Sequence, residues 1–183
     1  MDHNNILAVV LAGGKSKRFG RDKSQVKLGN KILIDYILDE IIDFYKDILV
    51  VTNEPIKFSN SNKISLTSDF QKGLGPLGGV LSAMKWIKDN KKNYKWISTF
   101  PIDTPFFKKK HLNKFYKEVD LNKSNLFFMK SKNTRHNIFG LWSLELYEKL
   151  EFALNEGNRK VEIWANDIGV KIIDFGYENN KDP

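Results

Sequence analysis

A glycine-rich segment with several cations follows the first apolar run of the sequence. Residues 6–11 are all apolar and predict a buried β-strand. Gly13 and Gly14 then let the backbone turn tightly and approach a ligand closely. Cations that can neutralise a polyphosphate come next, at Arg18, Arg21 and Lys23. Because α/β proteins hold nucleotides where a strand leads into such a loop, the segment predicts a nucleotide site.

The spacing of these residues excludes two common phosphate-binding loops. In a P-loop, four residues separate a first glycine from the triplet Gly-Lys-Ser/Thr; the triplet is present at Gly14, but no glycine stands five positions before it, so the full pattern is absent. The dinucleotide fingerprint Gly-x-Gly-x-x-Gly is not supplied by Gly13, Gly14 and Gly20. The alternative to a nucleotide loop is a glycine-rich surface turn with incidental cations.

Asp103 is the most specific single candidate for chemistry. It lies between Pro101 and Pro105, shortly after the predicted strand 96–100, so its carboxylate is held rigidly at the end of that strand. Mg²⁺ takes few protein carboxylates and completes its shell with water and phosphate oxygens, which suits this position. The alternative is an aspartate that caps the following helix.

Two further polar groups and a second glycine-rich loop follow other predicted strands. Asn53 could contact a nucleobase, and Asp69 could lie near the base, the ribose or the metal; both residue types are also ordinary turn formers. The second loop would allow close ligand approach, or would simply start a helix. Its residues are Gly73, Gly75, Pro76, Gly78 and Gly79.

Apolar periodicity predicts the elements that must position these groups. Strands alternate with helices, which favours one α/β domain with a mostly parallel sheet and helices on both faces. Because ligands bind outside the carboxyl ends of such strands, the polar groups should meet in one cleft. We expect strands at 6–11, 47–52, 63–67, 96–100, 125–129, 138–142 and 170–175, and helices at 33–45, 80–87, 109–119, 144–155 and 160–167.

Composition excludes several classes of protein. The chain has 183 residues, is 41% hydrophobic and has no cysteine, so disulfide frameworks, cysteine nucleophiles and thiolate zinc sites are excluded. No apolar stretch reaches about 18 residues, so we expect no membrane span. The N-terminus lacks a basic secretory region, which makes the cytoplasm the default location. The net charge of +8 indicates a lysine-rich surface more than a nucleic-acid site, because no recognition motif accompanies the lysines.

The residues from Val10 to Lys23 resemble the start of nucleotidyltransferases, and the Gly-Gly form with Asp22-Lys23 resembles the molybdenum cofactor guanylyltransferases. Phe19, Ile102 and Asn137 depart from the usual pattern, but they remove no charged group from the expected chemistry. The resemblance covers nearly the whole chain in order. Its other elements are Thr52-Asn53, Ser68-Asp69 with 73–79, Asp103-Thr104-Pro105, 135–142, and Gly157-Asn158-Arg159-Lys160-Val161 with Trp164.

This resemblance implies a Rossmann-like three-layer fold of the nucleotide-diphospho-sugar transferase type. It also implies transfer of GMP from GTP to Mo-molybdopterin with Mg²⁺, with nucleotide binding up to about residue 105 and acceptor binding beyond it. Implied catalytic residues are Arg18, Lys23 and Asp103, with Asp103 as the metal ligand. Implied nucleotide-binding residues are Leu11, Ala12, Gly13, Gly14, Lys23, Asn53, Asp69, Gly75, Pro76 and Asp103. Implied acceptor-binding residues are Arg135, His136, Arg159 and Lys160.

Partner proteins of such an enzyme would insert molybdenum or be chaperones of molybdoenzymes, with no nucleic acid or membrane involved. Three alternatives remain open. One is a related transferase that uses CTP or another nucleotide with a different acceptor. Another is a nucleotide-binding adapter that has lost catalysis. The third, a basic nucleic-acid-binding protein, is least favoured because aromatic and basic residues do not cluster in a recognition motif.

Overall fold

A seven-stranded sheet forms the centre of the protein, with strand order β5-β4-β1-β6-β8-β7-β9. The computed structural model describes residues 3–13, 26–56, 62–71, 73–132 and 134–176. The described strands are β1 (Ile6–Leu11), β2 (Lys27–Leu28), β3 (Lys31–Ile32), β4 (Ile48–Val51), β5 (Ile64–Thr67), β6 (Trp96–Pro101), β7 (Leu126–Ser131), β8 (Thr134–Ser143) and β9 (Lys171–Asp174).

The sheet is mostly parallel. Strands β5, β4, β1 and β6 pair in parallel, and so do β7 and β9. Strand β8 runs antiparallel to both of its neighbours, β6 and β7. The carboxyl ends of β1, β4, β5 and β6 therefore meet at one edge, as the order of elements predicts.

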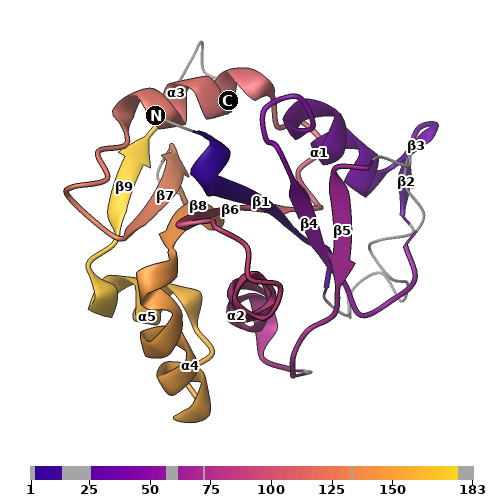
Figure 1. The fold of residues 1–183 in the computed structure, drawn as a ribbon. Helices are drawn as coiled ribbons and strands as arrows, with labels where there is room; N and C mark the ends of the chain where they lie inside the picture. The colour runs from indigo at the N-terminus through magenta and orange to yellow at the C-terminus, as the bar shows by residue number, and fades with distance from the viewer. Residues whose placement is uncertain (1–2, 14–25, 57–61, 72, 133, 177–183) are drawn as a thin grey trace.

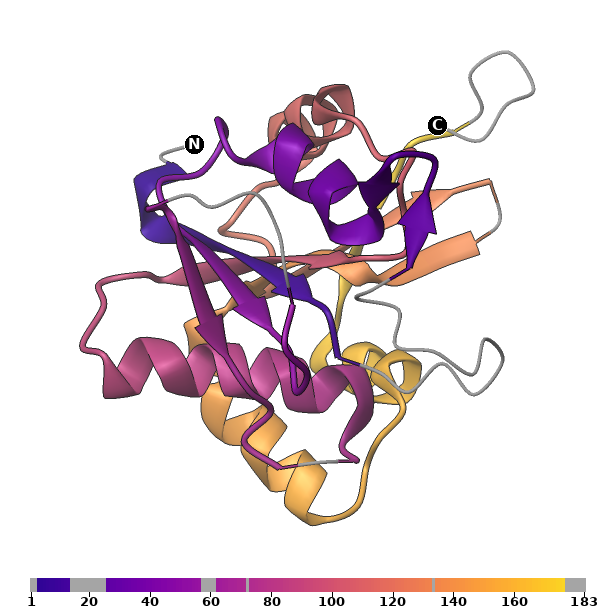
Figure 2. The same cartoon turned by 90° about the vertical axis from the view of Figure 1, so that its right-hand side faces the viewer.

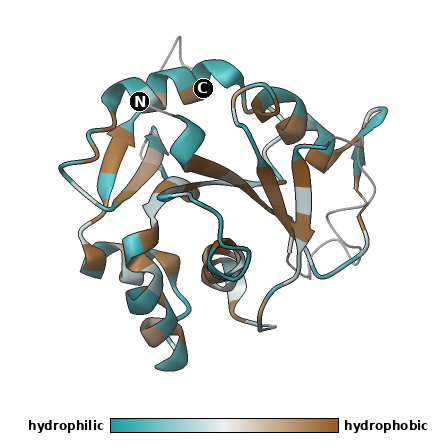
Figure 3. Ribbon diagram, in the orientation of Figure 1, coloured by the Kyte–Doolittle hydropathy of each residue, from teal (hydrophilic) through white to brown (hydrophobic). Residues whose placement is uncertain are grey.

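Helices cover both faces of the sheet (Figures 1 and 2). Helices α1 and α3 pack on one face, and α2, α4 and α5 pack on the other, so two apolar cores lie on either side of the strands. Figure 3 shows the hydrophobic residues along the inner strands and the hydrophilic ones on the outer sides of the helices. The helices are α1 (Leu33–Ile41), α2 (Gly75–Asp89), α3 (Lys109–Glu118), α4 (Tyr147–Asn155) and α5 (Val161–Ile168), with 3₁₀ turns η1 (His3–Asn5) and η3 (Leu144–Leu146).

This arrangement confirms the expected three-layer α/β fold, and three of its local differences from the predicted elements concern the hairpin, α1 and β8. The hairpin of β2 and β3 was not expected, since strands of two residues carry no readable alternation. Helix α1 ends at Ile41, although Tyr45 beyond it is still buried. Strand β8 begins at Thr134, so the segment from Arg135 belongs to the sheet. None of the helices in the described part of the chain is long and apolar enough to cross a membrane.

Candidate functional site

Asn53 and Asp69 meet at the carboxyl ends of β4 and β5. The Asn53 amide donates to Asp69 Oδ2 at 2.6 Å, and the Asp69 backbone N–H donates to Asn53 Oδ1 at 3.1 Å. Gly13 lies beside them, because a Cβ atom placed on it would be 3.4 Å from Asp69 Oδ2 and 3.9 Å from Asn53 Nδ2. Residues predicted separately from three strand ends therefore form one polar group.

Helix α2 packs tightly behind this group. A Cβ atom on Gly79 would lie 2.9 Å from a methyl of Leu11, so the Leu11 side chain would have to shift to accept a larger residue. Ser82 accepts the Phe70 backbone N–H at 2.8 Å and donates to the Gly78 carbonyl at 2.8 Å. These contacts fix the start of the helix beside Asp69. Gly75 begins the helix with a positive φ of 66°, and Pro76 follows in its first turn.

Asp103 lies in a turn that is held by hydrogen bonds within its own residues. The Thr104 hydroxyl donates to the Pro101 carbonyl at 3.0 Å, and the Phe107 N–H donates to the Thr104 carbonyl at 3.1 Å. The Asp103 side chain is exposed at the end of β6. The turn therefore presents a carboxylate where the sequence predicts it.

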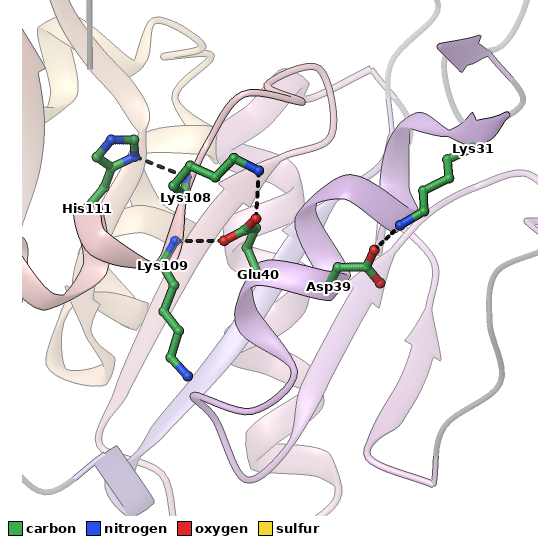
Figure 4. A network of polar contacts seen from close by, with 6 residues as sticks. All are labelled: Lys31, Asp39, Glu40, Lys108, Lys109 and His111. Carbon is green, nitrogen blue, oxygen red and sulfur yellow. Dashed lines mark hydrogen bonds and ion pairs between the residues drawn. The ribbon is translucent and has the colours of Figure 1, made fainter. Parts of the chain in front are cut away.

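Glu40 of α1 fixes the helix that follows this turn (Figure 4). Its carboxylate accepts from Lys108 Nζ and from the Lys109 N–H, both at 2.8 Å. Burial favours the neutral acid, but these hydrogen bonds and the Lys108 charge outweigh it, so the pKa of Glu40 lies below its usual value. His111 accepts the Lys108 N–H through Nδ1 at 3.1 Å. Helix α3 thus begins at a fixed position beside Asp103.

A cavity of about 710 Å³ opens next to Asp103 on the face covered by α1 and α3. Its wall includes the hairpin residues Val26 and Leu28 and the rings of Phe107 and Phe139, which stack with centroids 4.9 Å apart. Phe106 also lines the cavity and is 81% exposed, so it stands at the rim. The remaining lining residues are Leu33, Asp103, Thr104, Pro105, His111, Met129, Lys130, Ser131, His136 and Phe175.

Arg135 and His136, predicted together, point to opposite faces of the sheet because side chains alternate along β8. His136 lines the cavity. The Arg135 guanidinium instead donates to Asn137 Oδ1 and Asn166 Oδ1, both at 2.6 Å, and to the Glu162 carbonyl at 3.3 Å. Arg135 therefore ties β8 to α5.

Arg159 and Lys160 are exposed in the turn that precedes α5. The Lys160 backbone N–H donates to Asn158 Oδ1 at 3.3 Å, which shapes this turn. Neither side chain is among those that line the cavity. The four predicted acceptor residues thus divide between the cavity and the opposite face.

Gly14, Arg18 and Lys23 lie outside the described residues, as does the whole segment from residue 14 to residue 25. Among the described residues, no three His, Asp or Glu side chains gather as a metal cluster. Sequence reasoning missed Ser131, which binds His136, and the aromatic wall at Phe107 and Phe139. In the sequence, the two aromatic residues fit the apolar pattern of core residues in strands and helices, so nothing marked them as lining a cavity.

A mostly parallel sheet with helices on both faces defines a doubly wound α/β protein, a class that binds ligands such as nucleotides at the carboxyl ends of its strands. The sequence is also matched at residues 8–167 by the family model of the MobA-like NTP transferase domain. The chain therefore belongs to the MobA-like NTP transferase family.

Individual relatives agree with this assignment. The molybdenum cofactor guanylyltransferase of Haemophilus influenzae (strain 86-028NP) is 32% identical over 94% of this chain and 88% of its own. A protein of the same name from Rhizobium rhizogenes is 30% identical over 95% of this chain and 81% of its own.

Solved structures share the fold. A protein from Aquifex aeolicus superposes with a TM-score of 0.76 at 24% identity, covering 94% of this chain and 87% of its own. Molybdopterin-guanine dinucleotide biosynthesis protein A from Archaeoglobus fulgidus gives 0.73 at 23% identity, covering 92% and 83%. A cytidylyltransferase from Francisella tularensis gives 0.72 at 17% identity, covering 97% and 93%.

Proposed function

We propose that this protein transfers GMP from GTP to the terminal phosphate of Mo-molybdopterin and releases diphosphate. The observation that carries the proposal is the joining of Gly13, Asn53 and Asp69 at the strand ends, with Asp103 on the neighbouring strand. The names of the relatives that are at least 30% identical over most of the chain support guanine and molybdopterin as the substrates.

The described residues divide the work by position in the sheet. Asn53, Asp69 and Gly13 would hold the guanosine at the ends of β1, β4 and β5, where glycine permits close approach. Asp103 follows β6, the next strand, so the triphosphate would extend toward it. Arg18 and Lys23, which follow β1 in the sequence, would neutralise the phosphates.

The reaction needs little covalent participation by the protein. An anionic oxygen of the acceptor phosphate attacks the α-phosphorus of GTP, and the bond from that phosphorus to the diphosphate leaving group breaks. The attacking oxygen is already deprotonated, so no general base is required. Positioning and charge neutralisation therefore supply most of the acceleration.

Mg²⁺ fits the donor set at this edge of the sheet. Asp103 is an exposed carboxylate, and Mg²⁺ is commonly held by one or two carboxylates together with substrate phosphates. When bound, the ion would neutralise developing charge on the phosphates. We propose Asp103 as the protein ligand of this ion. The proposal also includes a cytoplasmic location and the partner proteins of molybdenum metabolism.

Calorimetric titration of GTP, CTP and ATP tests the proposal, in Mg²⁺ and again in chelator. We expect GTP to bind best. We also expect Mg²⁺ to tighten GTP binding in the wild type but not in Asp103→Ala, so that the GTP affinities of the two proteins in Mg²⁺ differ by about tenfold, or roughly 1.4 kcal/mol. Asp43→Ala is the matched control, since Asp43 is an exposed aspartate beyond α1. Preference for CTP would replace this function by the cytidylyl alternative, and absence of nucleotide binding would refute both.

A further inference from the structure

The cavity beside Asp103 is poorly suited to hold a phosphate group. Lys130 is the lysine among its described lining residues, and its Nζ lies 2.8 Å from Asp174 Oδ2, which neutralises it. Arg135, the nearby arginine on β8, serves the opposite face. The wall therefore offers an incoming anion little compensation for its lost hydration.

The same wall is well suited to a flat ring. The stacked pair of Phe107 and Phe139 forms one side, and Phe175 adds a third ring to the lining. Phe106 stands exposed at the rim, where it could cover a ring that enters. The volume of about 710 Å³ lies in the ordinary range for small-molecule sites.

His136 brings hydrogen-bonding capacity into this apolar wall. Its Nε2 is 2.6 Å from the hydroxyl oxygen of Ser131, a buried residue on the neighbouring strand. This bond fixes the ring plane and leaves the other ring nitrogen, Nδ1, as a second donor or acceptor. A polar group held in a mostly apolar site gives orientation and specificity to a ligand.

The order of strands places this cavity opposite the nucleotide group. Asn53 and Asp69 follow β4 and β5, whereas Ser131 and His136 belong to β7 and β8, and β6 with Asp103 lies between the two pairs. A nucleotide held on one side and an acceptor substrate held on the other would thus bring their phosphates together at Asp103.

We propose that the cavity binds the flat heteroaromatic ring of the acceptor, that His136 reads the hydrogen-bonding edge of that ring, and that Ser131 is the positioning residue that fixes the imidazole. The inference rests on the proposed function for the identity of the acceptor. Such a cavity would select acceptor phosphate esters that carry a heteroaromatic ring over phosphate esters of sugars or simple alcohols. The phosphate itself binds outside the cavity, toward Asp103.

Unsubstituted pterin is a suitable probe because it is fluorescent and lacks a phosphate. It also resembles guanine, so the titration is made in saturating GTP, which blocks the nucleotide site. We expect saturable quenching by the wild type, about tenfold weaker in His136→Phe and in Phe106→Ala. Phe152→Ala is the control, since Phe152 is an exposed aromatic on α4, on the opposite face.

Ser131 is tested by a pair of variants. Ser131→Ala should weaken pterin binding several-fold and shift the ¹⁵N signals of the His136 imidazole, while Ser131→Thr, which keeps the hydroxyl, should restore both. The affinity for GTP should not change in either variant. An unchanged imidazole spectrum in Ser131→Ala would overturn the positioning role.

Two further results would overturn the cavity assignment. One is pterin binding that is seen in a parallel titration without GTP but is lost in saturating GTP, and the other is GTP binding with no pterin binding in the wild type under either condition. The second result would leave the proposed nucleotide untouched. Pterin binding in a protein that prefers CTP would instead refute the proposed function and leave the cavity assignment intact.

Discussion

Asn53 and Asp69 act as a pair in which each side chain orients the other. One N–H of the Asn53 amide goes to Asp69, and its carbonyl oxygen accepts the Asp69 backbone N–H. An amide has two N–H groups, so Asn53 retains hydrogen-bonding capacity for a base. The pair therefore presents a prearranged polar surface beside Gly13 instead of two independent turn residues.

Gly13→Ala tests the close approach of a ligand to this pair. A Cβ atom on Gly13 would meet nothing nearer than 3.4 Å, so the folded protein should accept alanine with a change in unfolding free energy within about 0.5 kcal/mol. The added methyl group would occupy space at the nucleotide, and we expect about tenfold weaker GTP binding. Calorimetry and a thermal melt measure both effects. Unchanged GTP affinity would remove Gly13 from the site.

The sequence predicted which residues gather at the strand ends but not how they bond. The predicted strands before Gly13, Asn53, Asp69 and Asp103 indicated their common edge, because parallel topology sends strand ends to one side. The hydrogen bonds between Asn53 and Asp69 depend on the pairing of β4 with β5, and this pairing cannot be predicted from the local sequence of either strand. The opposite placement of Arg135 and His136 also could not be predicted from local pattern, because it depends on β8 extending back to include both residues.

At the scale of elements, β8 joins the parallel half of the sheet to β7 and carries His136 to the cavity. Gly140 lies where β8 contacts both neighbours: it pairs with Thr99 of β6 and Phe128 of β7. A Cβ atom there would be 2.4 Å from the Phe128 ring and 2.6 Å from the Phe127 carbonyl oxygen. The Phe127 backbone cannot move away without breaking the sheet.

Gly140→Ala should therefore destabilise the protein by about 3 kcal/mol, at the upper end of overpacking costs. Denaturant unfolding measures the change. The matched comparison is Gly13→Ala, the same substitution at the end of another strand without a clash. Equal stability of the two variants would contradict the packing described for β8.

At the scale of the whole molecule, two cores share one sheet, and a buried hydroxyl cluster anchors one of them. Tyr45 donates to Ser98 at 3.0 Å and lies 2.8 Å from the Tyr116 hydroxyl, which must then be the donor in that bond. The cluster links the segment after α1, strand β6 and α3. Burial raises the pKa of Tyr116 to about 12 and that of Tyr45 well above its usual range.

These shifts predict loss of stability in alkaline solution. An unfolded tyrosine loses its proton near pH 10, whereas the folded Tyr116 keeps its proton to about pH 12. The folded state therefore binds more protons between these values, and the free energy of unfolding falls as the pH rises from about 10 to 12. Tyr116→Phe should show a shallower fall in denaturant titrations at pH 9 and pH 11. Equal slopes would contradict the role of Tyr116.

The three-layer fold and most of its elements followed from the apolar periodicity of the sequence. The hairpin of β2 and β3 did not, because two-residue strands show no period, yet Val26 and Leu28 at this hairpin form part of the cavity. The cavity arises from the meeting of segments that are far apart in the sequence, including Phe107, Phe139 and Phe175. Each of these residues, taken alone, has the pattern of a core residue.

Covalent transfer of GMP to a molybdopterin phosphate is the most direct test of the proposed function. GTP with a radioactive α-phosphate is incubated with Mo-molybdopterin and Mg²⁺ in the absence of oxygen, and the products are separated by chromatography. We predict that the label moves to the pterin with release of one diphosphate per transfer, and that Asp103→Asn lowers the rate by about 100-fold. Label that stays in GTP, or CTP that serves as the donor equally well, would contradict the account.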